Sequence, residues 1–172
     1  MYRTDKIVDT ELLYILDNLR EEDKIECEVL RGPDWKDKLF NDLISSSSKF
    51  ILAKTKKDDT PVLIAGAWPT DKNTPQIACV WLLSTPEIEN HKICFLKEMK
   101  KEIQKYDEKF SLLYNQIYVK NELAKSWLKW AGFRFPKSEK KLKLLDKEFL
   151  KIETPENFEM FYRERPVKGL GE

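Results

Sequence analysis

The stretch after residue 110 constrains the fold most, because it joins a strand, a capped helix and an enforced stop. β-prone residues run over 110–119, and Asn121 then stands where a helix cap is expected. Apolar residues recur at helical spacing up to residue 131, which predicts one buried face over residues 121–131. Gly132 supplies the residue type that ends a helix, and Phe133 begins an alternation typical of a strand. The expected unit is strand, helix and strand.

Length and composition predict one folded domain. The chain has 172 residues, of which 41% are hydrophobic and 12% aromatic. We expect residues 1–165 to form the domain and residues 166–172 an exposed tail. The 31 Lys and Arg nearly cancel the 30 Asp and Glu, so the net charge of +1 does not indicate nucleic-acid binding.

The expected compartment is a cytoplasm. No apolar run approaches the ~20 residues that cross a membrane, and the first residues lack a signal-peptide core. Cys27, Cys79 and Cys94 are predicted to be buried free thiols. A metal site is not expected, because no closely paired cysteines occur and His91 is the only histidine.

The remaining pattern predicts a mixed α/β domain. Helices are expected near residues 9–20, 35–44 and 91–103, and strands near 49–55, 62–68, 76–83, 149–152 and 158–163. Residues 76–83 are almost continuously apolar, as expected of a central buried strand. Residues 21–24 are predicted to be a solvated turn, residues 25–30 to be extended, and the lysine-rich residues 136–147 to be turn-like.

This order of elements resembles the core of the GNAT superfamily of acyl-CoA-dependent N-acyltransferases. The resemblance implies a central, mostly antiparallel sheet flanked by helices, with acetyl-CoA bound at the central strand and its following helix. It implies three groups of cofactor-binding residues: Val80, Trp81 and Leu82 at the pantetheine arm, Asn90, His91 and Lys92 at the phosphates, and Asn121 and Ala124 beside the arm.

A closer resemblance is to the internal virion protein A family of T7-like podophages, which has a GNAT-like fold. Four segments carry it: residues 20–26, 81–85, 95–96 and 127–133. The resemblance implies a bacteriophage protein with other virion proteins as partners, located in the host cytoplasm during infection or in the virion.

One departure from the GNAT pattern concerns the phosphates. Active members carry a glycine-rich loop after the central strand, whereas residues 84–91 contain no glycine. Pro86 lacks an N–H donor, and Glu87 and Glu89 bring negative charge. His91 is then either a phosphate ligand or a partly exposed residue at a helix start.

A second departure concerns proton transfer. Many members place a proton-donating tyrosine seven positions after the asparagine that corresponds to Asn121, where this chain has Leu128. Tyr118 and Tyr114 on the preceding strand are candidate substitutes, with packing as the alternative role. The phage family shares an acidic cluster after its first helix, and this resemblance makes Asp23, Glu26 and Glu28 candidates for the general base, represented here by Glu26, with a solvated turn as the alternative. The sequence therefore predicts a virion-associated protein with degenerate catalytic machinery or, alternatively, an active N-acetyltransferase that modifies a host or virion amine.

Overall fold

The computed structural model describes residues 1–4, 6–45, 50–70, 73–136, 142–144, 147–149 and 154–164. Its centre is a six-stranded sheet in the order β1-β2-β3-β4-β5-β8. The strands are β1 (Tyr2–Thr4), β2 (Phe50–Lys54), β3 (Pro61–Pro69), β4 (Ile77–Ser84), β5 (Leu112–Tyr118) and β8 (Phe158–Glu164). Neighbours are antiparallel except β4 and β5, which are parallel. This mixed, mostly antiparallel sheet confirms the predicted fold class.

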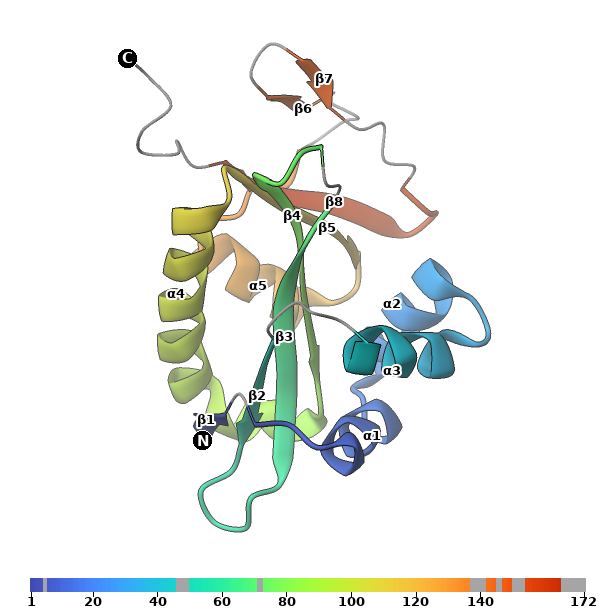
Figure 1. The fold of residues 1–172 in the computed structure, drawn as a ribbon, viewed down its shortest axis with the longest axis vertical. Helices are drawn as coiled ribbons and strands as arrows, with labels where there is room; N and C mark the ends of the chain where they lie inside the picture. Colours follow the sequence, from blue (N-terminus) through green and yellow to red (C-terminus); the bar gives the residue numbers. More distant parts are fainter. Residues whose placement is uncertain are drawn as a thin grey trace.

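Helices cover both faces of the sheet (Figure 1). One face carries α1 (Asp9–Asp17), α2 (Glu21–Arg31) and α3 (Trp35–Ser45), and the other carries α4 (Lys92–Lys109) and α5 (Glu122–Trp130). A 3-10 helix, η1 (Pro86–His91), leads directly into α4. The two largest core clusters of the described residues lie between α1, α3 and the sheet and beneath α4 and α5. None of the helices in the described ranges combines the length and apolar character needed to span a membrane.

Helix α2 overturns the prediction of a turn at 21–24 and an extended segment at 25–30. It begins after Arg20 with acidic residues in its first turn, where the helix dipole favours them, and it ends at Gly32, whose φ is 85°. The prediction failed because the inward side of the helix carries Asp23 and Glu26, so hydrophobic periodicity does not mark it.

The unit after residue 110 forms largely as predicted. Asn121 caps α5, since its Oδ1 accepts the Ala124 N–H at 3.3 Å, and Gly132 ends the helix with φ 85°. The strand predicted next is reduced to one bridge, Arg134 with Tyr162. Pro136 stands at the next pairing position and has no N–H to donate, so the ladder stops there.

Smaller differences concern the cysteines and the lysine-rich segment. All three cysteines are free, but only Cys27 is fully buried, while Cys79 and Cys94 are partly exposed. The segment 136–147, predicted to be turn-like, contains β6 (Leu142–Leu144), which pairs with β7 (Lys147–Phe149) in a separate two-stranded sheet. The predicted tail at 166–172 and the predicted strand residues 150–152 lie outside the described residues.

Arg163 of β8 fastens the ends of α4 and α5. Its Nε and Nη2 donate to Asp107 at 3.0 and 2.8 Å, and its Nη1 donates to the carbonyl of Ala131. The side chain is buried and passes directly over Gly132, where an added Cβ would meet Nη1. Gly132 therefore serves the turn and also leaves room for the arginine.

Replacing Gly132 with alanine should destabilise the protein more than replacing Gly32. Both residues have φ 85°, so both substitutions strain the backbone by about 1 kcal/mol. Only Gly132→Ala also displaces Arg163, which should add roughly 1–2 kcal/mol. Urea denaturation measures both variants, and equal losses would contradict the role given to Arg163.

Candidate active site: a cavity through the split sheet

The parallel pair β4–β5 is joined only at one end. Its register runs from Ile77 with Leu112 to Cys79 with Tyr114, and the strands then diverge. Antiparallel partners hold the outer edges of both strands, β3 along β4 and β8 along β5. The sheet thus contains a split, which we call the β4–β5 split, bounded by residues 80–84 of β4 and 115–118 of β5.

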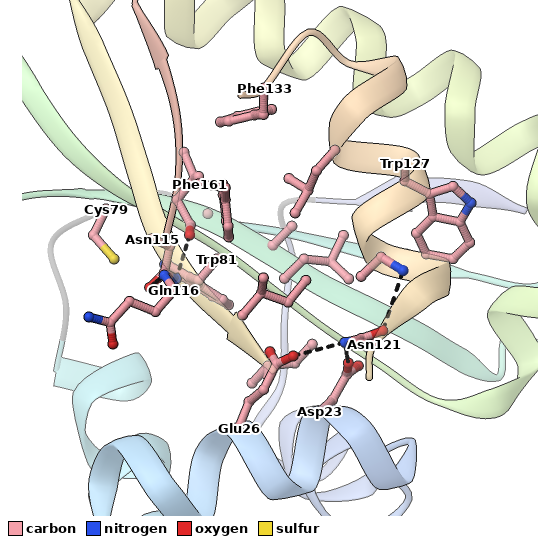
Figure 2. Close-up of a pocket in the computed structure, with 18 of the residues that line it drawn as sticks. Asp23, Glu26, Cys79, Trp81, Asn115, Gln116, Asn121, Trp127, Phe133 and Phe161 are labelled. Atoms are coloured by element: carbon pink, nitrogen blue, oxygen red, sulfur yellow. Dashed lines mark hydrogen bonds between the residues drawn. The ribbon is translucent and has the colours of Figure 1, made fainter. Parts of the chain in front are cut away.

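Asn115 closes the narrow end of the split with its side chain (Figure 2). Its Nδ2 donates to the Val80 carbonyl at 2.8 Å, and its Oδ1 accepts the Gln116 N–H at 2.8 Å. The side-chain amide takes the place of a backbone peptide and extends the ladder by one step after the strands have separated.

Asp23 of α2 holds the β4 side of the wide end. Its Oδ2 accepts the backbone N–H and the hydroxyl of Ser84 at 2.9 and 2.8 Å. Its Oδ1 accepts Arg20 Nη2 at 2.7 Å, and both side chains of this ion pair are buried. Burial lowers the pKa of Arg20, but the adjacent Asp23 carboxylate outweighs it, so the pKa is raised and the guanidinium stays charged.

Glu26, one helical turn further along, holds the β5 side. Its Oε1 accepts the Tyr118 N–H at 3.2 Å and Asn121 Nδ2 at 2.9 Å. Asn121 is buried and also receives Arg20 Nη2 on its Oδ1 at 3.0 Å. Arg20, Asp23, Glu26, Ser84 and Asn121 therefore form one network, which we call the clamp.

The environment of Glu26 suits a general base. Burial raises its pKa to about 7, although the hydrogen bonds from Asn121 and Tyr118 favour the carboxylate and oppose that rise. A carboxyl group with this pKa is a strong enough base to take a proton and is ionised in about half of the molecules near neutral pH. Figure 2 shows it at the edge of the cavity, beside Asp23 and Asn121.

A cavity of about 560 Å³ passes through the split. Residues from both faces of the sheet line it. All of its charged lining residues in the described chain, Asp23, Glu26 and Arg31, belong to α2. The α4–α5 side is lined by apolar and aromatic residues: Phe95, Leu96, Met99, Ile103, Tyr106, Ala124, Trp127, Leu128, Trp130, Ala131, Phe133 and Phe161. One half is therefore charged and the other apolar.

The residues predicted to hold a pantetheine arm lie at the cavity. Val80, Trp81 and Leu82 of β4 line it, as does Ala124 of α5. Asn121 lines it as well, but both ends of its amide are engaged in the clamp and in the cap of α5.

The residues predicted to bind phosphates lie away from the cavity. Asn90, His91 and Lys92 are not among its lining residues. Asn90 Nδ2 donates to Glu87 at 3.0 Å, and His91 Nε2 lies 3.2 Å from the same carboxylate. Lys92 is exposed at the first position of α4.

The two aromatic candidates for proton transfer differ in position. Tyr118, the predicted donor, packs its ring against Phe158 with centroids 5.9 Å apart and is absent from the cavity lining in the described chain. Tyr114 lines the cavity, but burial raises the pKa of its hydroxyl and so weakens it as an acid. Leu128 does line the cavity, at the position where the resemblance leads one to expect a tyrosine.

Sequence reasoning missed Arg20, Ser84 and Asn115. The first was taken for the end of a helix, Ser84 for the start of a loop, and Asn115 for a strand residue without a role. Gly32 was the available signal for α2, since a glycine that stops a helix implies a helix before it. No group of His, Cys, Asp or Glu within the described ranges is arranged to hold a metal ion.

Comparison with known proteins shows the fold. No protein-family model and no curated protein sequence matches the chain. Solved structures do match over nearly its whole length. A GCN5-related N-acetyltransferase from Kribbella flavida gives a TM-score of 0.66 at 12% identity, covering 95% of this chain and 97% of its own.

Two further matches are enzymes with stated substrates. Spermidine N-acetyltransferase from Vibrio cholerae, solved with CoA and spermine, gives a TM-score of 0.63 at 9% identity, with 95% of this chain and 94% of that chain covered. Ribosomal-protein-alanine N-acetyltransferase from Brucella melitensis gives 0.61 at 12% identity, with 96% and 100% covered. The chain therefore has the fold of the GNAT-family acetyltransferases.

Removing the Asp23 carboxylate should open the clamp and cost much of the stability. Asp23→Ala leaves the Arg20 guanidinium buried without its counter-charge and Ser84 without its acceptor, so we expect a loss of about 3–5 kcal/mol in the free energy of unfolding. Glu28→Ala removes an exposed carboxylate from the same helix and should change it by less than about 0.5 kcal/mol. Urea denaturation measures both, and similar losses would contradict the clamp.

Proposed function

We propose that this protein is an N-acyltransferase, which moves an acyl group from a thioester to an amine across the β4–β5 split. The observation that carries the proposal is Glu26, a carboxyl group with a pKa of about 7 at the wall of a cavity that passes through the sheet. The fold of GNAT-family acetyltransferases supports it.

The edge of β4 suits an amide-containing thioester arm. The Val80 carbonyl and the Ser84 N–H are both bonded from the split side. Because alternate residues of a strand direct their backbone groups to the same side, the N–H and C=O of Leu82 also face the split, beyond the end of the β4–β5 ladder. Pantetheine carries amides that pair with such an edge as an added strand would.

The residues after β4 do not suit a diphosphate. Residues 84–91, which include η1, contain no glycine, and Pro86 has no N–H to donate. Glu87 accepts a hydrogen bond from Asn90 and places its carboxylate 3.2 Å from His91 Nε2, so negative charge lies at the side chains that a phosphate would need. We therefore assign the arm to Leu82 and assign no residue to the nucleotide diphosphate of CoA.

The chemistry follows from Glu26. The thioester supplies an activated carbonyl carbon, which the neutral amine nitrogen attacks. The C–N bond forms as the C–S bond breaks, Glu26 takes the proton that the amine loses, and the thiolate takes a proton from water. Only the ionised carboxylate can accept that proton, so the rate should rise with pH through about 7.

Glu26→Gln should reduce acyl transfer by about 100-fold or more and abolish this pH dependence. The fold should survive, because both hydrogen bonds to Glu26 end on Oε1, which glutamine retains. Mass spectrometry of amines incubated with acetyl-CoA measures the transfer. Spermidine and an alanine-initiated peptide are suitable acceptors, because two of the matched structures are acetyltransferases for those classes of amine. Equal activity of the two proteins would refute the role of Glu26.

A second candidate is a non-catalytic role, in keeping with the podophage resemblance. Two features favour it: the glycine-free η1, and the Phe95–Trp127 pair, whose ring centroids lie 4.3 Å apart between α4 and α5. On this proposal the protein is a packing module of a virion or of its assembly, located in the infected host's cytoplasm or in the particle, with other virion proteins as partners. Micromolar binding of acetyl-CoA in calorimetry would count against it, and so would absence of the chain from purified particles and assembly intermediates.

A further inference from the structure

The apolar half of the cavity includes helix residues that are only partly buried. Helix α5 has a strongly one-sided distribution of apolar residues, including Trp127 and Leu128, yet none of its residues is fully buried. On α4, Leu96 and Met99 are also only partly buried. These residues line the cavity and also pack on their neighbours, as Trp127 does on Phe95, with ring centroids 4.3 Å apart. Apolar surface that lines a cavity favours an apolar ligand, because the ligand removes that surface from water.

This half has an aromatic floor at the narrow end of the split. Phe161 of β8 is the register partner of Asn115, whose side chain closes that end. Phe133 meets Phe161 edge-on with centroids 5.4 Å apart, and Ile103 of α4 completes the floor. Leu82 lies nearer the wide end, between Val80 and the clamp. A thioester carbonyl held at Leu82 therefore has an apolar space ahead of it that ends in side chains without charge.

The distribution of charge in the cavity points to the acyl group. The volume of about 560 Å³ covers both halves and includes the space for the thioester arm, and it is in the range that holds drug-sized ligands. Because α2 supplies every charged lining residue in the described chain, a charged or strongly polar group in the α4–α5 half would lose hydration without gaining a charged partner.

We propose that the α4–α5 half of the cavity binds an unbranched aliphatic acyl chain, so that the substrate class is a medium-chain acyl thioester and not acetyl. The inference rests on the proposed function for the position of the thioester, but its test is a binding measurement. On this proposal the acyl chain runs from Leu82 past Met99 toward Ile103, Phe133 and Phe161.

Acyl-pantetheines provide the probe, because they lack the nucleotide diphosphate for which no site is assigned. We expect affinity, measured by calorimetry, to rise from acetyl- through butanoyl- and hexanoyl- to octanoyl-pantetheine. Each buried methylene contributes about 0.8 kcal/mol, which corresponds to about threefold to fourfold in affinity per carbon until the space is full. A series that is flat, or tightest for acetyl, would overturn the inference.

Two variants test where the acyl chain lies in the cavity. Met99→Trp should fill the space and cut octanoyl binding at least tenfold while changing acetyl binding little, and Met99→Leu, with nearly the same volume, should behave as the parent. Ala131→Met narrows the space from the α5 side and serves if Met99→Trp fails to fold. If the filled variant bound octanoyl-pantetheine as tightly as the parent protein, the acyl chain would lie elsewhere and the inference would be wrong.

The same series in Glu26→Gln separates this inference from the proposed function. That variant keeps the apolar walls, so its binding should still increase with chain length. If binding follows the series but no acyl length is transferred by the parent protein, the chain-binding site stands and the proposed transfer reaction is refuted. If transfer occurs from acetyl donors while affinity ignores chain length, the reaction stands and this inference is refuted.

Discussion

Two carboxylates of α2 hold together a sheet that its own backbone leaves open. Beyond Cys79 and Tyr114 no ladder joins β4 to β5, so buried peptide groups on both strands need other partners. Asp23 bonds the end of β4 and Glu26 the end of β5, while Asn121 connects the two carboxylates. Burying the two carboxylates would be costly on its own, and it is offset here by the Arg20 guanidinium and by the backbone N–H groups that donate to them. The cavity exists because this network holds the strands apart at a fixed width.

The clamp also explains why the two carboxylates have different chemistry. Asp23 accepts an arginine, a hydroxyl and a backbone amide, and is committed to structure. Among the described residues Glu26 has no cation in direct contact and both of its hydrogen bonds end on Oε1, so burial dominates and its pKa rises to about 7. Two acids on one helix thus differ in their partners, with Asp23 engaged in structural hydrogen bonds and Glu26 left as the candidate base.

Hydrophobic periodicity predicted the parts of the fold that apolar residues build. The central strand, α3, α5 and the stop at Gly132 follow from patterns that burial alone enforces. It failed at α2, where the buried positions are acidic and resemble a solvated turn until Ser84 and Asn121 are known to lie opposite. The strand expected after Gly132 failed for a tertiary reason, since Pro136 ends its pairing with β8. Glu26 was identified as a candidate from sequence resemblance, but only the folded structure shows its desolvation and its contact with Asn121.

The amide of Asn115 has a consequence for how such a cavity can change during evolution. On one side of it the sheet is held by backbone pairing, which few substitutions alter, and on the other by side chains, which any substitution alters. One step of the sheet beyond Cys79 and Tyr114 is therefore encoded by a single side chain. A residue without an amide at this position would leave the Val80 carbonyl without this donor, so one codon decides whether the sheet closes one step further than its backbone ladder.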